Sequence, residues 1–90
     1  MIEITDSAKA ELHRMMGGYD FDEGQGFRLA TPPVWEGPGD FGIVIDAGRD
    51  RDHVVEHEGV EVLRLDPGTA EHLAKAVMDF KESRFTLDVY

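Results

Sequence analysis

Alternating apolar and polar positions dominate the second half of the chain and predict strands. Residues 53–57 and 60–65 flank Glu58-Gly59, which predicts a hairpin whose tight turn uses a glycine with positive φ. Residues 84–89 alternate in the same way and predict a final strand. Shorter strand patterns cover residues 2–4, 27–31 and 41–46, and the strand at 27–31 is expected to be buried on one face only.

Two segments carry helix signals instead. From Ala8 to Met16 apolar residues recur at spacings of three and four, and Thr5-Asp6-Ser7 before them offers capping oxygens. Gly17-Gly18 is expected to end this helix through a left-handed turn. Asp66-Pro67 predicts a second helix start, with Asp66 as N-cap. Residues 76–81 fit either the end of that helix or a strand, because both periodicities match them.

The loop between the second and third strands is rich in proline and glycine and contains the single tryptophan. Residues 31–40 hold three prolines and two glycines, so regular structure is not expected there. Trp35 has two interpretations: it folds back over the edge of the core, or it is exposed and, with Glu36, binds a protein partner. The second is preferred slightly, because the prolines are expected to keep the loop extended and only Val34 flanks the ring with apolar surface.

Length and composition fit one globular domain over residues 1–90. The chain is 41% hydrophobic, with one Trp, two Tyr and five Phe to build a modest core. Hairpin-connected strands and two helices, in the order strand, helix, strands, helix, strand, indicate an α+β fold with mostly antiparallel strands.

Charge and cysteine content exclude several functions. Nine Lys and Arg against nineteen Asp and Glu give a net charge of −10, which argues against binding to nucleic acid or to anionic membrane surfaces. No apolar run approaches the roughly 20 residues of a membrane span, and no signal peptide is recognisable, so we expect a cytoplasmic protein. The absence of cysteine excludes disulfides, thiolate metal sites and Cys-ligated iron–sulfur clusters.

Short segments taken in order resemble the HesB-like family, the A-type iron–sulfur cluster carriers. They are Ile4-Thr5-Asp6-Ser7-Ala8, Gly26-Phe27-Arg28-Leu29, Gly59-Val60-Glu61-Val62 with Asp66-Pro67, Met78-Asp79-Phe80 and Arg84-Phe85-Thr86. The resemblance implies a small β-rich domain with two packed sheets and two helices. The stretch from Gly59 to Asp66 is about one residue longer than the family pattern, which is consistent with a β-bulge.

The same resemblance implies that the family's site is missing. The family carries one cluster-ligand cysteine in the loop after the Gly-x-Arg-Leu strand, where this chain has Glu36 or its neighbour. The family's other two ligands lie in a C-terminal Cys-Gly-Cys tail, and the sequence stops at Tyr90, before such a tail could begin. No functional residue of the family can therefore be transferred to this chain.

Histidines and acidic residues offer the remaining metal-binding chemistry. His53 and His57 are four residues apart, but on a strand that spacing separates them by about 13 Å, too far for one ion. His13 and His72 have no partner nearby in the sequence. We therefore expect no metal site, with His53, His57 and Glu36 as the weak candidates for ligands.

Taken together, the sequence predicts a non-catalytic domain without a cofactor. Its expected role is binding to a protein partner or to itself, with an accessory role in iron–sulfur assembly as one form of this. The alternative is a divalent-metal-binding protein that uses Asp, Glu and His in place of thiolates.

Overall fold

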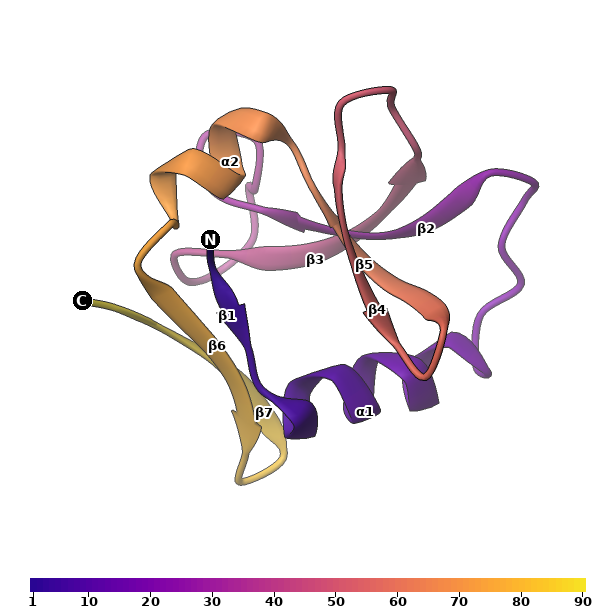
Figure 1. Cartoon of the computed structure of the whole chain (residues 1–90), viewed down its shortest axis with the longest axis horizontal. Helices are drawn as coiled ribbons and strands as arrows, with labels where there is room; N and C mark the ends of the chain where they lie inside the picture. The colour runs from indigo at the N-terminus through magenta and orange to yellow at the C-terminus, as the bar shows by residue number, and fades with distance from the viewer.

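A computed structural model describes all of residues 1–90, and it contains two helices and seven strands (Figure 1). In chain order the elements are β1 (Glu3–Ile4), α1 (Asp6–Met16), β2 (Gln25–Ala30), β3 (Gly42–Ala47), β4 (His53–His57), β5 (Val60–Leu65), α2 (Pro67–His72), β6 (Ala76–Lys81) and β7 (Arg84–Val89). The α+β class is therefore confirmed. Neither helix has the length and apolar composition that crossing a bilayer would require.

The strands form two mixed sheets. The four-stranded sheet has the order β3-β2-β5-β4 and the three-stranded sheet the order β1-β6-β7. Consecutive strands pair antiparallel in each hairpin (β2 with β3, β4 with β5, β6 with β7), whereas the pairings of β2 with β5 and of β1 with β6 are parallel. Both sheets thus combine local hairpins with one long-range parallel contact.

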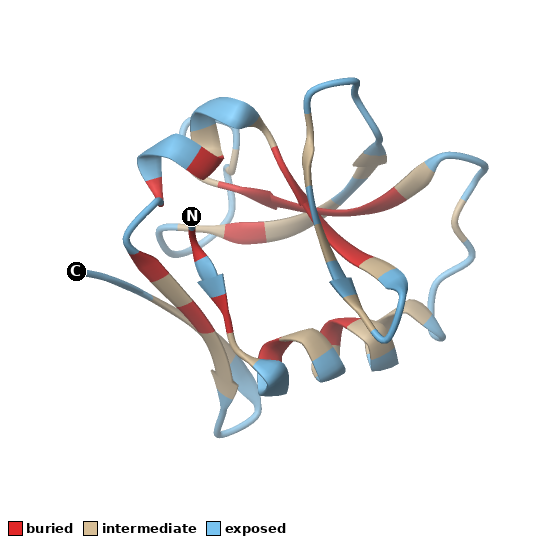
Figure 2. Cartoon of the chain, viewed as in Figure 1, coloured by how far each residue is buried: buried red, intermediate tan, exposed pale blue.

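One hydrophobic core joins both sheets and both helices. Helix α1 runs beneath the sheets and turns its buried residues Ala8 and Leu12 toward them (Figures 1 and 2). The largest fully buried side chains are those of Leu12, Leu29, Leu63, Leu65, Met78 and Val62. These come from α1, both central strands of the larger sheet and the central strand of the smaller one, so both sheets and α1 share one core.

Strand β2 is buried on both faces, which corrects the expectation of a half-buried strand. Phe27 and Leu29 belong to the core, and Arg28 and Ala30 on the opposite face are only 2% and 4% exposed. β2 is flanked by β3 and β5, and the Arg28 face is covered by the loop before β4 and by the start of α2. Two-face burial is typical of a central strand that is covered on both sides.

The start of α1 agrees with the expectation from the sequence, whereas the end of α1 and the capping of α2 differ from it. Thr5 caps α1 by accepting a hydrogen bond from the Ala8 amide. Gly17, however, has φ −67°, so α1 ends in right-handed backbone and not in the expected left-handed turn. Asp66 occupies the N-cap of α2 without a side-chain cap bond, because its carboxylate binds arginines instead.

Residues 76–81, for which the sequence allowed either the end of a helix or a strand, form a strand. Helix α2 ends at His72, and β6 then pairs with β1 on one side and β7 on the other. The apolar residues that fit a longer helix, such as Val77 and Phe80, lie in β6. Strand pairing on both sides of β6 thus prevails over the local helical pattern.

The β4–β5 hairpin has the expected tight turn and bulge. Glu58 and Gly59 have φ angles of 53° and 80°, so both central residues are left-handed, as a type I′ turn requires. Val55 pairs with Leu63, and Glu56 pairs with Glu61, so Val62 is an extra residue in β5. The insertion expected from the sequence is confirmed, and its consequence is that Val62 and Leu63 are both buried.

Candidate functional site

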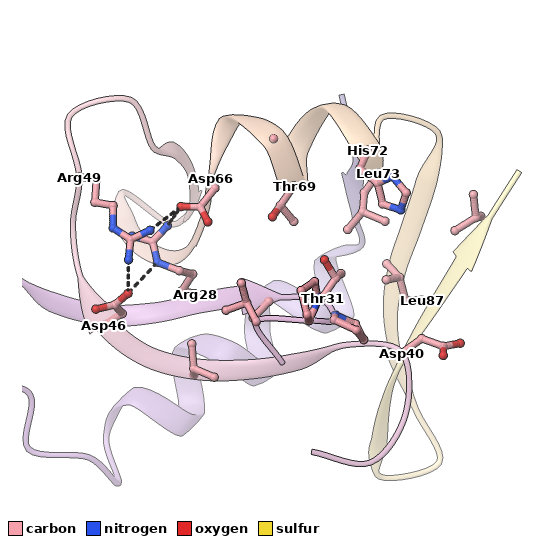
Figure 3. A pocket seen from close by; sticks show the side chains of 17 residues that line it. Arg28, Thr31, Asp40, Asp46, Arg49, Asp66, Thr69, His72, Leu73 and Leu87 are labelled. Carbon is pink, nitrogen blue, oxygen red and sulfur yellow. Dashed lines mark hydrogen bonds and ion pairs between the residues drawn. The ribbon is translucent and has the colours of Figure 1, made fainter. Parts of the chain in front are cut away.

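The largest cavity of the protein lies between α2, the loop after β2 and the end of β7. It has a volume of about 600 Å³, and its walls also include residues of β2 and β3 (Figure 3). The loop at residues 31–40 and the final strand are far apart in sequence, and the fold brings them to the same cavity. One end of this cavity is charged and the other is apolar.

Arg28 organises the charged end. Its Nη1 and Nη2 atoms donate to the two carboxylate oxygens of Asp52, both at 2.7 Å, in a bidentate pair. Nη1 also donates to Asp66 at 2.8 Å, and Nη2 donates to the Ala47 carbonyl at 2.9 Å. Nε lies 3.4 Å from an Asp46 oxygen. One guanidinium therefore ties β2 to the end of β3, the loop before β4 and the start of α2.

Ion pairs and hydrogen bonds dominate the electrostatics of this end, although the buried Nε of Arg28 has no hydrogen-bond partner. The Arg28 guanidinium holds the pKa of Asp52 at about 2, well below its usual range, and the Arg49 amide adds a further hydrogen bond to this carboxylate. The pKa of Arg28 is raised in turn, first by its hydrogen bond to Asp52. Arg49 bridges Asp46 and Asp66 at the cavity wall (Figure 3). The pairing of Arg28 with Asp52 thus stabilises the charged form of both groups.

The apolar end is formed by side chains from the loop, α2 and β7. Leu73 and Leu87 lie at the same end of the cavity in Figure 3, with His72 beside Leu73. At the rim, Val34 is 73% exposed and Val89 is 66% exposed. A cavity with an exposed apolar rim is a surface that a partner can cover.

Trp35 folds back on its own loop. The indole ring lies against Gly37 and Gly42 so closely that a Cβ atom on either glycine would overlap the ring. The indole Nε1–H donates to the Pro38 carbonyl at 3.0 Å, and the side chain is only partly exposed. The loop is therefore compact, and the extended loop expected from its prolines is wrong. Binding of a partner by Trp35 or by the exposed Glu36 stays a prediction.

The candidate metal ligands are placed in three different regions. His53 lies at the start of β4 and lines a smaller cavity of about 370 Å³ beside Pro67 and Ala70. His57, at the other end of β4, lies next to His13 of α1, with ring centroids 5.6 Å apart. Glu36 is exposed on the loop at residues 31–40. The fold thus gives His13 a partner that the local sequence did not show.

The burial of Arg28 and Arg64 is the feature of this region that the sequence pattern did not reveal. The alternation over residues 27–31 predicts a solvent-facing Arg28, and no pattern singles out Arg64 of β5, yet they are 2% and 8% exposed. The sequence did contain a signal of the buried arginine: Arg28 lies within the family-like Gly-Phe-Arg-Leu segment, and aspartates follow at positions 46, 50, 52 and 66. The ion pairs of these arginines form only when strands distant in sequence come together, and local sequence patterns do not contain that information.

Comparisons with solved structures show that the fold of this chain is similar to the folds of SufA and IscA. The crystal structure of Escherichia coli SufA, described as involved in biosynthesis of iron–sulfur clusters, matches 97% of this chain and 78% of its own, with a TM-score of 0.64 and 20% identity. A crystal structure of IscA with the [2Fe-2S] cluster matches 99% of this chain and 85% of its own, with a TM-score of 0.58 and 19% identity. The fold expected from the HesB-like resemblance is confirmed. No family model and no curated protein sequence matches the chain.

The residues of this chain do not fit an iron–sulfur cluster. It contains no cysteine, and the loop at residues 31–40 offers Trp35 and Glu36 in the region where the resemblance implies a thiolate. The cavity wall carries His72, Asp40 and Thr31 among apolar side chains, and this set lacks the sulfur donors that clusters require.

Proposed function

We propose that this domain is a non-catalytic protein-binding module that keeps the A-type carrier fold without holding a cluster. The observation that carries the proposal is the exposed apolar surface at the rim of the large cavity, formed by Val34 and Val89. Each of these side chains is more than half exposed. The rim would place them against the surface of a second protein, and an accessory role in iron–sulfur assembly is one form of such a function.

Two further features support this proposal. At the charged end of the cavity, the ion pairs of Arg28 with Asp52 and Asp66 fix the walls by joining β2 to the loop before β4 and to the start of α2. The loop at residues 31–40 is held by the packing of Trp35 on Gly37 and Gly42, so Val34 is presented on an ordered segment. A preorganised apolar surface loses less conformational entropy on binding than a mobile one.

A crosslinking experiment tests the proposal. A photoreactive amino acid at Val34 or Val89 is expected to crosslink to one defined protein, or to a second copy of this chain, and mass spectrometry would identify the partner. The same probe at Val54 is the matched control, because this valine is 46% exposed on β4 and lies outside the cavity. Equal crosslinking from Val34 and Val54, or none from either rim position, would contradict the proposal.

Self-association can be separated from binding of another protein. Sedimentation velocity over a wide concentration range measures whether the purified chain forms dimers. If it does, Val34→Asp with Val89→Asp should abolish the dimer, because each change places a charge in the interface, whereas Val54→Asp should not. If the wild-type chain stays monomeric, the protein that crosslinks to it in cells is identified as the partner.

A further inference from the structure

Away from the large cavity, three side chains with metal-binding atoms converge beneath the β4–β5 hairpin. They are His13 of α1, His57 at the end of β4 and Glu58 in the turn, and their ligand atoms all lie within 4.8 Å of one another. The two imidazole rings meet edge to face at 84°, and His57 Nε2 lies 3.3 Å from a Glu58 carboxylate oxygen. None of these three residues lines the large cavity described above.

The fold holds the three ligands in place from two directions. Helix α1 packs against β4 and β5, and Figure 1 shows the tip of this hairpin above the second half of α1. The type I′ turn fixes Glu58 at φ 53° directly after His57. His13 and His57 are only partly exposed, so their rings are confined by packing, whereas the Glu58 carboxylate reaches the site from solvent.

The donor set selects among metal ions. Two imidazoles and one carboxylate are the protein ligands of many zinc sites that keep a fourth position for water. Magnesium and calcium prefer sites made wholly of oxygen ligands, so they fit less well. Bonds of 2.0–2.1 Å in a tetrahedral site place ligand atoms about 3.3 Å apart. The His57–Glu58 pair already has this spacing, and the His13 ligand atom lies within 4.8 Å of both.

The surrounding charge favours a cation. The chain carries a net charge of −10, which raises the local concentration of divalent ions. The nearest basic residue in the sequence, Arg14, is occupied by a bidentate pair with Glu11, so its charge is largely neutralised. A metal at this position would join α1 to the β4–β5 hairpin.

We propose that His13, His57 and Glu58 bind one Zn²⁺ ion, with water in the remaining coordination position. The site is separate from the apolar rim of the cavity, so it does not depend on the protein-binding role. Bound zinc would stabilise the folded state, because the three ligands converge only after α1 and the hairpin have packed.

Zinc binding by the purified chain tests this proposal directly. We expect competition with a chromophoric chelator to show one equivalent of Zn²⁺ per chain, and Co²⁺ substitution to give the visible absorption of a four-coordinate site. His13→Gln and His57→Gln should each weaken binding about tenfold or more, and Glu58→Gln should also weaken it. Zinc uptake that is absent in wild type, or unchanged in both histidine variants, would overturn the proposal.

The chain offers matched controls for each ligand. Glu82 has φ 54° at the same position of the β6–β7 turn, so Glu82→Gln repeats the Glu58 change at an equivalent turn without the histidines. His53→Gln repeats the His57 change at the other end of β4. Both controls should bind zinc like wild type. Because a ligand variant could fail to fold, histidine ring NMR of the wild type gives an independent readout. Zinc should shift the His13 and His57 signals, and equal shifts at His53 and His72 would contradict the site.

Discussion

Arg28 and Arg64 are direct register partners on the parallel strands β2 and β5, so two buried cations lie side by side in the sheet. Arg28 binds carboxylates, chiefly Asp52, whereas Arg64 donates to Glu61 and to the carbonyls of Gly24 and Asp46. Neighbouring like charges are tolerated because each guanidinium has its own set of acceptors. Both arginines also donate hydrogen bonds to backbone carbonyls at the end of β3, which hold this segment and the following loop against the sheet.

The first prediction concerns Asp52 and acid. Its pKa of about 2 is below the unfolded value of 3.8, so its charge stabilises the fold above pH 4. That contribution is lost as the pH falls from about 4 through 2. Asp52→Asn should therefore lower the free energy of unfolding by about 2 kcal/mol or more at pH 7, and flatten its decline below pH 4. Urea unfolding at several pH values measures both effects.

Asp50→Asn is the control for Asp52, because Asp50 is exposed in the same loop and makes no ion pair in the structure. It should unfold like wild type at every pH. An equal loss of stability in both variants would show that the loop charge, and not the pairing with Arg28, is responsible.

The second prediction concerns the net charge of −10. Repulsion among the unpaired carboxylates opposes folding at pH 7, so added salt should raise the thermal midpoint there. Mild acidification to about pH 5.5 should leave the midpoint unchanged or raise it, because the strongly paired Asp52 stays ionised. Calorimetry at low and physiological salt checks this, and a midpoint that falls with salt would refute it.

The third prediction concerns iron–sulfur clusters. Anaerobic incubation with iron and sulfide should leave the purified chain colourless after desalting, since it offers no thiolate. Visible absorption and iron and sulfide analysis measure the outcome. An A-type carrier with its cysteines, treated in parallel, is the positive control; a stoichiometric cluster on this chain would be the contrary result.

The fourth prediction concerns the contact of Trp35 with Gly42. Gly42→Ala would place a Cβ atom where the ring now lies, so the indole must leave its position. Because Trp35 is the single tryptophan, its fluorescence should shift to longer wavelength as the ring enters water. Trp35→Ala, which removes a partly buried ring, should lower the free energy of unfolding by about 2 kcal/mol.

Gly39→Ala is the matched control for the loop in terms of space, because no atom lies close to where its Cβ would be. It has φ 85°, so the substitution costs backbone strain without touching the ring. Fluorescence should then stay at the wild-type wavelength even where stability falls. An unchanged emission maximum in Gly42→Ala would show that the ring does not rest on this glycine.

Local pattern predicted most strands and the start of both helices, because these depend on neighbours in sequence. The hairpin at Glu58-Gly59 and the bulge in β5 are examples, since turn chemistry and spacing fix them. The end of α2 was ambiguous because β6 is stabilised not only by the adjacent β7 but also by β1, which is distant in sequence. The same limit hid the contact of His13 with His57, which exists only once α1 lies under β4.

For the candidate site, too, some features could be predicted from the local sequence, whereas others depend on long-range contacts. That the loop at residues 31–40 lacks a thiolate could be read from the sequence, but the cavity that it shares with Val89 could not. Asp66 was expected to cap α2, and its carboxylate instead binds Arg28 and Arg49. A carboxylate at a helix start has two kinds of donor to choose from, and only the folded chain shows which one lies closer.

The parallel pairing of β1 with β6 also has a consequence for synthesis on the ribosome. Ile4 pairs with Met78, and both are buried, so the first strand has no partner until β6 has been synthesised. At ordinary translation rates that interval is roughly 4 to 15 s. During it α1 and the larger sheet can already assemble, while Ile2 and Ile4 stay in water. The nascent chain is therefore expected to expose a short apolar segment that only the last strands can cover.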